Sequence, residues 1–364
     1  MVVAGKARVL IVDDAVVVRK ALADALARDP ALEVVGSAAN GRMALTKFAL
    51  LRPDIVLLDI EMPEMNGLET IPELRKLAPR IPIIMFSTLT ERGAAATLDA
   101  LTLGASDYVT KPSNLDMGAT SRAITEELVP KIRALCRLAP PPSATGLVAP
   151  PLGAVVRIRK APRLSAPVKI VAIGVSTGGP EALARVIPCL PAGFPVPVVI
   201  AQHMPPIFTA MLASRLSDKS SIPVRECKPG DPLSAGVAWI APGDYHMVLK
   251  AEAGVVRLQT HQGPRENFCR PSVDVLFRSV AELFGSQTLA VILTGMGQDG
   301  FKGCETLAAK GARIVVQDEA TSVVWGMPGF VARAGLADKV LPLEGIGPEI
   351  VCRVAGLSGC AIPR

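Results

Sequence analysis

Short apolar runs alternate with amphipathic stretches along most of this chain, and that alternation constrains the fold more than any other feature. In the first block, from Ala7 to about Pro112, the apolar runs are RVLIVDD, EVVGSAA, DIVLLDI, IPIIMFST and DYVTKP. A βα repeat of this kind predicts a parallel sheet covered by helices. Five strands in this length predict a flavodoxin-like, doubly wound α/β domain, in which functional residues collect at the carboxyl ends of the strands.

The same alternation resumes at Val168, with the runs VKIVAIGVS, VPVVIAQH, PVRECK, TLAVILTG and RIVVQDE. A helix is expected around Ser272 to Phe284. From about Leu233 to Thr260 the runs VAWIAP, HMVLKAE and GVVRLQT interrupt the repeat, and they predict antiparallel strands or hairpins added to the sheet. The second half is therefore predicted to be another doubly wound α/β domain, with a β-hairpin insertion.

The segment between the two blocks has the composition of a linker. After a helical stretch at about 124–138 it reads APPPSATGLVAPPLGAVVRIRKAPRLSAP, which is rich in Pro, Ala and Gly and lacks helical or strand periodicity. A chain of 364 residues is long enough for two domains. We expect a first domain at 1–125, a helical extension and Pro/Ala-rich basic linker at 126–167, and a second domain at 168–356.

The net charge of +6 is concentrated around this linker. Eight of the 39 basic residues, and no Asp or Glu, lie between Leu128 and Pro180, so the rest of the chain, with 33 acidic residues, is slightly acidic. The basic charge therefore belongs to a connector, for which a solvated tether is the expected role, and not to a nucleic-acid-binding surface.

Neither a membrane segment nor an export signal is expected. No run of about 18 apolar residues lacks a charge, Pro or Gly, and the N-terminus MVVAGKARVLIVDD leads directly into a predicted strand. These features predict a cytoplasmic protein. The seven cysteines are scattered without a CxxC pair, so they are expected to be reduced thiols and not a metal or disulfide framework.

Acidic, hydroxyl and lysine residues stand at the ends of the strands predicted in the first block. In chain order they are Asp13 and Asp14, Asp59, Ser87 and Thr88, and Lys111. In a parallel sheet these side chains converge on one edge, where three carboxylates would repel one another without a cation. A few carboxylates and waters suit Mg²⁺. Acids after strands can also cap helices, but capping does not account for this combination.

The second block places Ser176 between an apolar strand and a helix, in IGVSTGGPEAL. The GxSxG pattern permits a sharp turn that exposes a nucleophilic hydroxyl, although the same serine could be an ordinary helix N-cap. Two further strand ends favour the nucleophile, because one strand ends at His203 and another is followed by Asp299. An imidazole can take the hydroxyl proton and a carboxylate can orient the ring. The order Ser, His, Asp differs from that of α/β-hydrolases and disfavours that fold.

The three histidines of the chain can be compared as candidate bases. His203 is the best candidate because it ends a strand, as Ser176 does. His246 begins a strand of the insertion and is expected to pack, and His261 in a polar loop is expected at the surface. The backbone N–H groups of Thr177 and Met296 are candidate donors for a developing oxyanion.

The first 112 or so positions resemble the response-regulator receiver family. The matching motifs are DD at 13–14, LLDIEMPEMNGL, ST at 87–88 and KP at 111–112. The resemblance implies that Asp59 accepts a phosphoryl group from a histidine kinase. It also implies that Asp14, Asp59 and the backbone carbonyl of Glu61 hold Mg²⁺, and that Asp13 supports the metal site.

The same resemblance assigns the switch residues of the first domain. Ser87 would hydrogen-bond the phosphoryl group, Lys111 would pair with it, and Tyr108 would move with the switch. Asn66 departs from the family, in which many members carry Asp. Because that side chain is not a metal ligand, phosphorylation is expected to remain intact.

The second domain closely resembles the chemotaxis protein-glutamate methylesterases, the CheB family. The matching stretches are GVSTGGPEAL, QHMP, IAPGDYHM, RPSVDVLF, LTGMGQDG and VWGMPG. The resemblance implies that a serine esterase removes methyl groups from glutamate side chains of chemoreceptors, releases methanol, and deamidates selected receptor glutamines. It makes Ser176, His203 and Asp299 the catalytic residues, with Thr177 and Met296 at the oxyanion site, and it implies no catalytic metal.

The resemblance also implies that the unphosphorylated receiver blocks the catalytic cleft and that phosphorylation relieves this block. A monomer is expected, with receptors and a kinase as partners and with neither nucleic acid nor direct membrane insertion. Two alternatives remain open. The chain could be a receiver-controlled DNA-binding regulator, which would need a compact basic output domain, or a catalytically silent adaptor.

Overall fold

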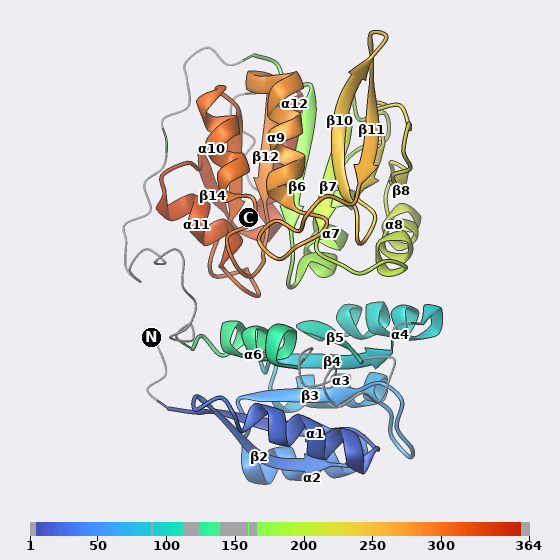
Figure 1. Ribbon diagram of the computed structural model, residues 1–364, viewed down its shortest axis with the longest axis vertical. Helices are drawn as coiled ribbons and strands as arrows, with labels where there is room; N and C mark the ends of the chain where they lie inside the picture. Colours follow the sequence, from blue (N-terminus) through green and yellow to red (C-terminus); the bar gives the residue numbers. More distant parts are fainter. Residues whose placement is uncertain (1–4, 89, 112–123, 139–158, 160–165, 358–364) are drawn as a thin grey trace. The chain divides into compact units, whose positions relative to one another are not determined.

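The computed structural model describes residues 5–88, 90–111, 124–138, 159 and 166–357, and the chain forms two compact units, Met1–Leu147 and Val148–Arg364 (Figure 1). Most of the predicted linker, and Pro112 at the end of the first block, lie outside the described residues. Each unit is built around its own parallel sheet.

The first unit contains the predicted five-stranded parallel sheet, in the order β2-β1-β3-β4-β5. Its strands are β1 (Ala7–Val12), β2 (Leu32–Ala38), β3 (Ile55–Asp59), β4 (Ile83–Thr88) and β5 (Asp107–Lys111). Its helices are α1 (Val16–Leu26), α2 (Gly41–Leu51), α3 (Gly67–Leu77), α4 (Glu91–Thr102), the π-helix η1 (Ile124–Leu128) and α6 (Val129–Leu135). The strand order reverses between β1 and β3, and such a switch point opens a crevice at the carboxyl ends of the strands.

Burial explains why these segments form strands and helices. Every residue of the central strand β3 is buried, as expected for a parallel strand covered on both faces. The predicted helical stretch after residue 123 belongs to the first unit, because Ile124, Leu128 and Ile132 join the apolar core made by β1 and α1. Helix α3 begins with a capping box, in which Asn66 accepts from the backbone N–H of Glu69 and Glu69 accepts from that of Asn66.

The second unit is a seven-stranded, fully parallel sheet in the order β14-β13-β12-β6-β7-β9-β8, with a separate two-stranded hairpin. Its strands are β6 (Ile170–Val175), β7 (Val198–Gln202), β8 (Val224–Glu226), β9 (Ala238–Ile240), β10 (His246–Glu252), β11 (Val255–His261), β12 (Thr288–Ile292), β13 (Arg313–Gln317) and β14 (Lys339–Leu341). Its helices are α7 (Gly179–Val186), η2 (Ile187–Cys189), α8 (Phe208–Asp218), α9 (Val273–Phe284), η3 (Gly285–Gln287), α10 (Phe301–Ala309), α11 (Met327–Arg333) and α12 (Leu343–Val354).

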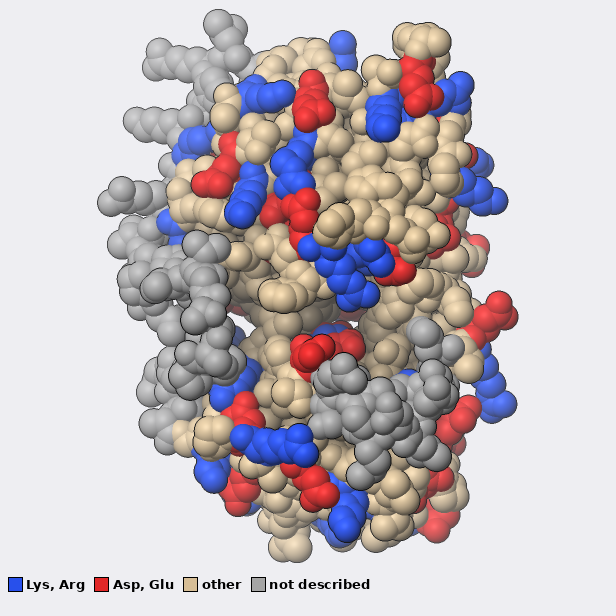
Figure 2. Space-filling view, viewed as in Figure 1, with Lys and Arg blue, Asp and Glu red and all other residues tan. Residues whose placement is uncertain are grey.

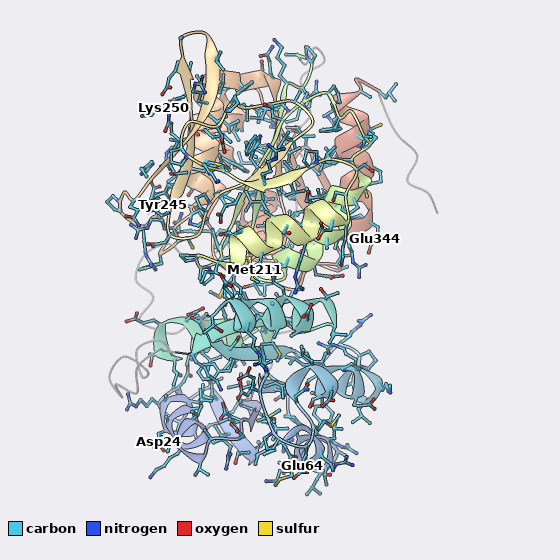
Figure 3. The ribbon with its side chains drawn as sticks, turned by 90° about the vertical axis from the view of Figure 1, so that its right-hand side faces the viewer. Asp24, Glu64, Met211, Tyr245, Lys250 and Glu344 are labelled. Carbon is cyan, nitrogen blue, oxygen red and sulfur yellow. The ribbon has the colours of Figure 1, made fainter. Side chains whose placement is uncertain are left out.

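Helices cover both faces of this sheet, so the doubly wound prediction is confirmed. Helices α9, α10 and α11 pack on one face, with the β10–β11 hairpin against α9, and α7 and α12 pack together on the other. Figure 3 shows Lys250 on the hairpin and Glu344 on α12 at opposite sides of the unit. The strand order reverses between β6 and β12, so the switch-point crevice lies where these two strands end.

Two details of the second sheet differ from the sequence prediction. The run VAWIAP was predicted among antiparallel strands, but β9 is parallel to both β7 and β8. Its three residues are fully buried, and a strand covered on both faces carries no alternating pattern that would reveal its direction. Only HMVLKAE and GVVRLQT form the predicted antiparallel hairpin. The edge strand β14 was not predicted, because its three residues are too few for a recognisable apolar run.

Candidate active site and phosphorylation site

Two buried carboxylates and a lysine meet at the switch point of the first unit. The Lys111 ammonium lies 2.8 Å from Asp59 Oδ2 and 3.0 Å from Asp13 Oδ2. Burial, opposed by the charge of Lys111, raises the pKa of Asp59 to about 6, and the Asp13 charge adds to the rise. The pKa of Lys111 is also raised, because the two carboxylates outweigh its own burial. The cluster therefore holds more negative charge than one lysine compensates.

The donor set at this edge fits a hard divalent cation. Asp13 Oδ2 is buried and accepts no hydrogen bond within the described residues, although the Lys111 ammonium is close. Asp13, Asp14 and Asp59 each offer an oxygen, and the three oxygens lie within 4.8 Å of one another. Asp14 is exposed and, with Glu61, lines an open cavity of about 740 Å³. Oxygen ligands beside such a cavity suit Mg²⁺, which keeps several of its waters.

The predicted switch residues occupy the strands beside this cluster. Ser87 is buried on β4, and its hydroxyl donates to the carbonyl of Gly93 at 3.2 Å while accepting from the Thr97 hydroxyl at 2.7 Å. Tyr108 on β5 is buried, with the Lys131 ammonium 5.2 Å from its ring centroid. Burial raises the pKa of Tyr108. Ser87 and Tyr108 thus lie in one β4–β5 pair that ends beside Lys111.

The departure at Asn66 has a structural explanation. Its side-chain oxygen accepts from the Glu69 N–H at 2.9 Å as the N-cap of α3. Asn and Asp are about equally good N-caps, so Asn66 performs the local task that Asp would perform. The amide contributes no charge to the neighbouring carboxylate cluster.

Replacing Asp59 with asparagine is expected to stabilise the metal-free protein at neutral pH. A folded-state pKa raised above the ordinary 3.8 means that stability is present at low pH and is lost as pH rises through about 6. For Asp59 this loss amounts to about 3 kcal/mol at most, and Asp59→Asn should abolish it. In thermal unfolding with chelator, the stability of the variant relative to wild type should increase from about pH 4 to about pH 7. A constant difference between the two across this range would contradict the prediction.

In the second unit, Ser176 occupies a tight turn between β6 and α7. Gly178 adopts a φ of 77°, a left-handed conformation that glycine takes without strain, and it is the N-cap residue of α7. The Ser176 side chain therefore does not cap this helix. Its backbone N–H donates to the carbonyl of Thr294, and its own carbonyl accepts from the N–H of Gly179. The turn leaves the Ser176 hydroxyl at the partly exposed end of the strand.

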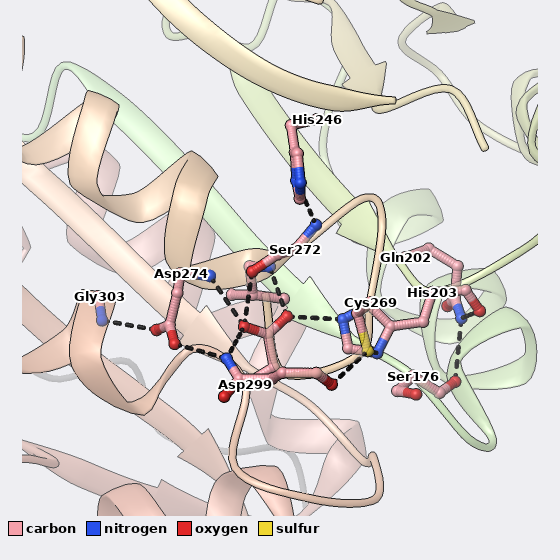
Figure 4. Close-up of polar contacts among 11 residues, drawn as sticks. Ser176, Gln202, His203, His246, Cys269, Ser272, Asp274, Asp299 and Gly303 are labelled. Atoms are coloured by element: carbon pink, nitrogen blue, oxygen red, sulfur yellow. Dashed lines mark hydrogen bonds and ion pairs between the residues drawn. The ribbon is translucent and has the colours of Figure 1, made fainter. Parts of the chain in front are cut away.

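Sheet register brings His203 beside this serine. Val175 pairs with Gln202 across the parallel strands β6 and β7, and Ser176 and His203 are the next residue on each strand. The His203 N–H donates to the Val175 carbonyl at 3.2 Å. Figure 4 shows Ser176 next to the His203 ring. Within the described residues no hydrogen bond joins the Ser176 hydroxyl to this ring, so the closing contact needs a side-chain rotation.

The third predicted residue, Asp299, binds the His203 ring directly. His203 Nε2 lies 2.7 Å from Asp299 Oδ2. Asp299 is buried, and four further groups donate to its two oxygens (Figure 4): the Ser272 hydroxyl, the Asn267 amide and the backbone N–H groups of Val273 and Asp274. These donors and His203 lower the pKa of Asp299 in spite of its burial. The carboxylate is therefore charged and fixed in position.

The neighbourhood of His203 controls its protonation. Burial lowers the pKa of His203. A negative charge on Cys269 and the Asp299 carboxylate outweigh this effect and raise the pKa to about 10. Burial and the charge of Asp299 raise the pKa of the neighbouring Asp274 to about 6. Asp299, which holds the imidazole, is therefore the carboxylate of this pair that ionises at the lower pH.

The two candidate oxyanion donors belong to turns next to the serine. Thr177 follows Ser176 in the turn before α7, and Met296 follows Gly295 in the turn after β12. A Cβ on Gly295 would lie 2.9 Å from Ser176 Cβ and would also collide with the Met327 sulfur. Only glycine therefore allows the second turn to approach the serine so closely.

The other two histidines have separate surroundings. His246 is buried; Nε2 lies 3.0 Å from the carbonyl of Pro264, and Nδ1 accepts from the Ser272 N–H at 3.2 Å. It packs as predicted. His261 is exposed as predicted, although it ends strand β11 and not a loop, opposite His246.

Sequence reasoning missed three residues around the site. Asn267 joins Asp299 to Asp274, Cys269 Sγ lies 3.5 Å from His203 Nδ1, and Gln202 donates from Nε2 to the Ser176 carbonyl. Asn267 and Cys269 occur in ENFCRPSVD, next to the recognised stretch RPSVDVLF, and that adjacency was the only available signal.

Comparison with known proteins gives matches in both units. Residues 9–120 match the response regulator receiver domain family and residues 171–350 match the CheB methylesterase family. A protein-glutamate methylesterase/protein-glutamine glutaminase of Trichodesmium erythraeum is 51% identical over 352 residues, covering 96% of this chain and 99% of the relative. The chain belongs to the CheB methylesterase family. A Nocardioides relative of the same name is 49% identical and covers 98% of both chains.

A solved CheB structure supports the fold of the second unit. The Thermotoga maritima CheB methylesterase catalytic domain aligns with a TM-score of 0.50 at 45% identity, covering 51% of this chain and 98% of that domain. The match of residues 171–350 to the CheB methylesterase family favours the esterase over the DNA-binding alternative. In agreement, basic and acidic side chains are interspersed over the described part of the face shown in Figure 2.

Two further expectations can be compared with the structure. None of the described helices is long and apolar enough to cross a membrane. The expectation that all cysteines are reduced is wrong for Cys352, which is disulfide-bonded. The other described cysteines are free thiols: Cys136, Cys189, Cys227, Cys269 and Cys304.

Proposed function

We propose that this CheB family member is a phosphorylation-regulated serine hydrolase that removes methyl groups from glutamate side chains of chemoreceptors and deamidates selected receptor glutamines. The observation that carries the proposal is the meeting of three strand ends, where the register of β6 and β7 sets Ser176 beside His203 and Asp299 holds the ring at 2.7 Å. Family membership supports the substrate class, because the relatives are named for this activity.

The proposed chemistry uses the ring nitrogen of His203 that faces away from Asp299. Since Nε2 is bound to Asp299, Nδ1 is the nitrogen that takes the proton from the Ser176 hydroxyl. The serine oxygen attacks the γ-carbonyl carbon of the methylated glutamate, and the C–O bond to the methoxy group then breaks. His203 returns the proton, so that methanol leaves and an ester to Ser176 remains. Water repeats both proton transfers and releases glutamate.

Backbone donors would stabilise the tetrahedral intermediates. The N–H groups of Thr177 and Met296 are proposed to bind the oxyanion, aided by the positive end of α7. Loss of one such donor typically raises the barrier by about 2.7–4 kcal/mol. With a glutamine substrate the same steps release ammonia in place of methanol.

In the receiver, Asp59 is proposed to accept the phosphoryl group from a histidine kinase. Asp14, Asp59 and the Glu61 carbonyl would hold Mg²⁺, supported by Asp13. The cation would neutralise phosphoryl charge during the transfer. Ser87, Lys111 and Tyr108 would then respond to the added charge. We assign the receiver to residues 1–125, the extension and linker to 126–167 and the catalytic domain to 168–356, in a cytoplasmic monomer.

Methanol release from methylated receptor fragments of the same genome tests both catalysis and control. The full-length chain should be slow without a phosphodonor and faster with one, and a chain that begins near Pro167 should be fast under both conditions. The Asp59→Asn variant, which cannot be phosphorylated, controls for direct effects of the phosphodonor. Equal rates for the full-length and shortened chains without phosphodonor would contradict inhibition by the receiver.

Labelling by a fluorophosphonate separates the enzyme from the catalytically silent adaptor. An activated serine reacts with this probe, so Ser176 should be modified and the Ser176→Ala variant should not. Absence of labelling in the phosphorylated wild-type protein would favour the adaptor.

A further inference from the structure

Cys269 contacts the side of His203 that the proposed mechanism needs. Its Sγ lies 3.5 Å from His203 Nδ1, on a loop that Asn267 ties to Asp299 (Figure 4). Cys269 and His203 are both partly exposed, while Asp299 is buried. The three side chains place a sulfur, a nitrogen and an oxygen within 4.8 Å of one another. Thiolate, imidazole and carboxylate are the usual protein ligands of zinc.

The distance between the two exposed donors matches zinc coordination. With Zn–N of about 2.0 Å, Zn–S of about 2.3 Å and a tetrahedral angle, the nitrogen and sulfur ligands are about 3.5 Å apart. The observed separation of Nδ1 from Sγ is 3.5 Å. The separation of the two donors therefore fits a cation that bridges Cys269 and His203.

Asp299 occupies the supporting position of such a site. A zinc-bound histidine commonly donates its other ring N–H to a carboxylate, which fixes the tautomer and makes the metal-binding nitrogen more basic. His203 Nε2 lies 2.7 Å from Asp299 Oδ2 in this arrangement. Ser272 and Asn267 in turn hold Asp299 by hydrogen bonds of 2.8 and 2.9 Å. The histidine is thus oriented as a zinc ligand would be.

We propose that Cys269 Sγ and His203 Nδ1 form an inhibitory Zn²⁺ site in the active site of this enzyme. Binding releases one proton from the Cys269–His203 pair to solvent, and water completes the coordination. The softness of the thiolate selects Zn²⁺ over Mg²⁺, whereas the all-oxygen cluster of the receiver has the opposite preference. One chain thus carries two cation sites of different chemistry.

Zinc at this position blocks ester hydrolysis, because a metal on Nδ1 removes the proton acceptor for Ser176. This consequence rests on the proposed function, whereas metal binding itself does not. Inhibition should be reversed by a chelator. It should also weaken as pH falls, because protons compete with the metal for both ligands.

Titration of the full-length protein with Co²⁺ tests the site without an activity assay. Thiolate ligation gives cobalt an intense ligand-to-metal charge-transfer band that the oxygen ligands of the receiver cannot produce. Cys269→Ala should lose the band, and Cys269→Ser, which keeps a donor toward the Asn267 carbonyl, should lose it too. Cys189→Ala is the matched control, because Cys189 is an exposed thiol outside the site and its removal should leave the band intact.

Zn²⁺ inhibition of methanol release, with phosphodonor and Mg²⁺ present, is the second measurement, and each variant is compared to its own rate in a zinc-selective chelator. The concentration for half-inhibition should rise at least about ten-fold in Cys269→Ser and should be unchanged in Cys189→Ala. Equal inhibition of wild type and Cys269→Ser, or a charge-transfer band that survives in both Cys269 variants, would overturn the proposal. If no methanol is released even with phosphodonor, Mg²⁺ and the zinc-selective chelator present, the proposed function fails, and the Co²⁺ titration still decides the metal site.

Discussion

Replacing Ser176 with alanine is expected to lower the rate of methanol release by about 10³- to 10⁶-fold and to leave folding unchanged. The loss is large because Ser176 carries the hydroxyl beside His203, whereas the neighbouring Thr177 is buried. Stability is retained because the hydrogen bonds of Ser176 to Thr294, Gly179 and Gln202 all use its backbone. Single-turnover assays with methylated receptor fragments measure the first effect, and thermal unfolding measures the second.

Ser234→Ala is a matched control for this variant. Ser234 is partly exposed in a loop, and its hydroxyl contacts only the nearby Pro232 carbonyl among the described residues. Its removal should leave the rate of methanol release unchanged. If Ser176→Ala retained a rate close to that of Ser234→Ala, Ser176 could not be the nucleophile.

Asp299→Asn is expected to damage both catalysis and stability. The rate of methanol release should fall by about 10³- to 10⁴-fold in this variant. The reason is that the amide no longer holds His203 in the tautomer that leaves Nδ1 unprotonated. Asp299 also accepts hydrogen bonds from Ser272, Asn267 and Val273, and an amide NH₂ would face some of these donors. Each buried donor left without an acceptor costs about 1–3 kcal/mol.

The sign of the pH dependence follows from the lowered pKa of Asp299. A depressed folded-state pKa means that the carboxylate stabilises the fold at neutral pH and loses this effect as pH falls below the ordinary value of 3.8. Asp299→Asn should therefore be less stable than wild type at neutral pH. The deficit should shrink in acid.

Asp274→Asn is the matched control, because Asp274 is a buried neighbour that accepts from Gly303 and Asn267 but does not contact His203. Its activity should stay within about ten-fold of wild type, since it loses no contact with the base. Steady-state assays and chemical denaturation at neutral pH separate the two variants. Similar activity in Asp299→Asn and Asp274→Asn would show that contact with His203 is unimportant.

Several parts of the fold could be predicted from local pattern. Buried parallel strands appear as continuous apolar runs, so β1, β3, β6, β7 and β12 were found directly. The direction of β9 could not be found, because a short strand buried on both faces has the same sequence pattern in either direction. The edge strand β14 was too short to detect. Both depend on pairing with strands that are distant along the chain.

The candidate active site, like the fold, could be predicted only in part from the sequence. Ser176, His203 and Asp299 stand next to recognisable strand ends, and the carboxyl ends of parallel strands must meet at one edge, so their proximity followed from the sequence alone. The sequence alone did not show which ring nitrogen of His203 binds Asp299. Nor did it show the group of donors around Asp299 or the contact of Cys269 with His203. They depend on a non-periodic loop before α9, whose contacts span up to 66 positions of the chain. Side-chain chemistry and strand periodicity are local properties, whereas the orientation of a ring and its neighbours is set by tertiary packing.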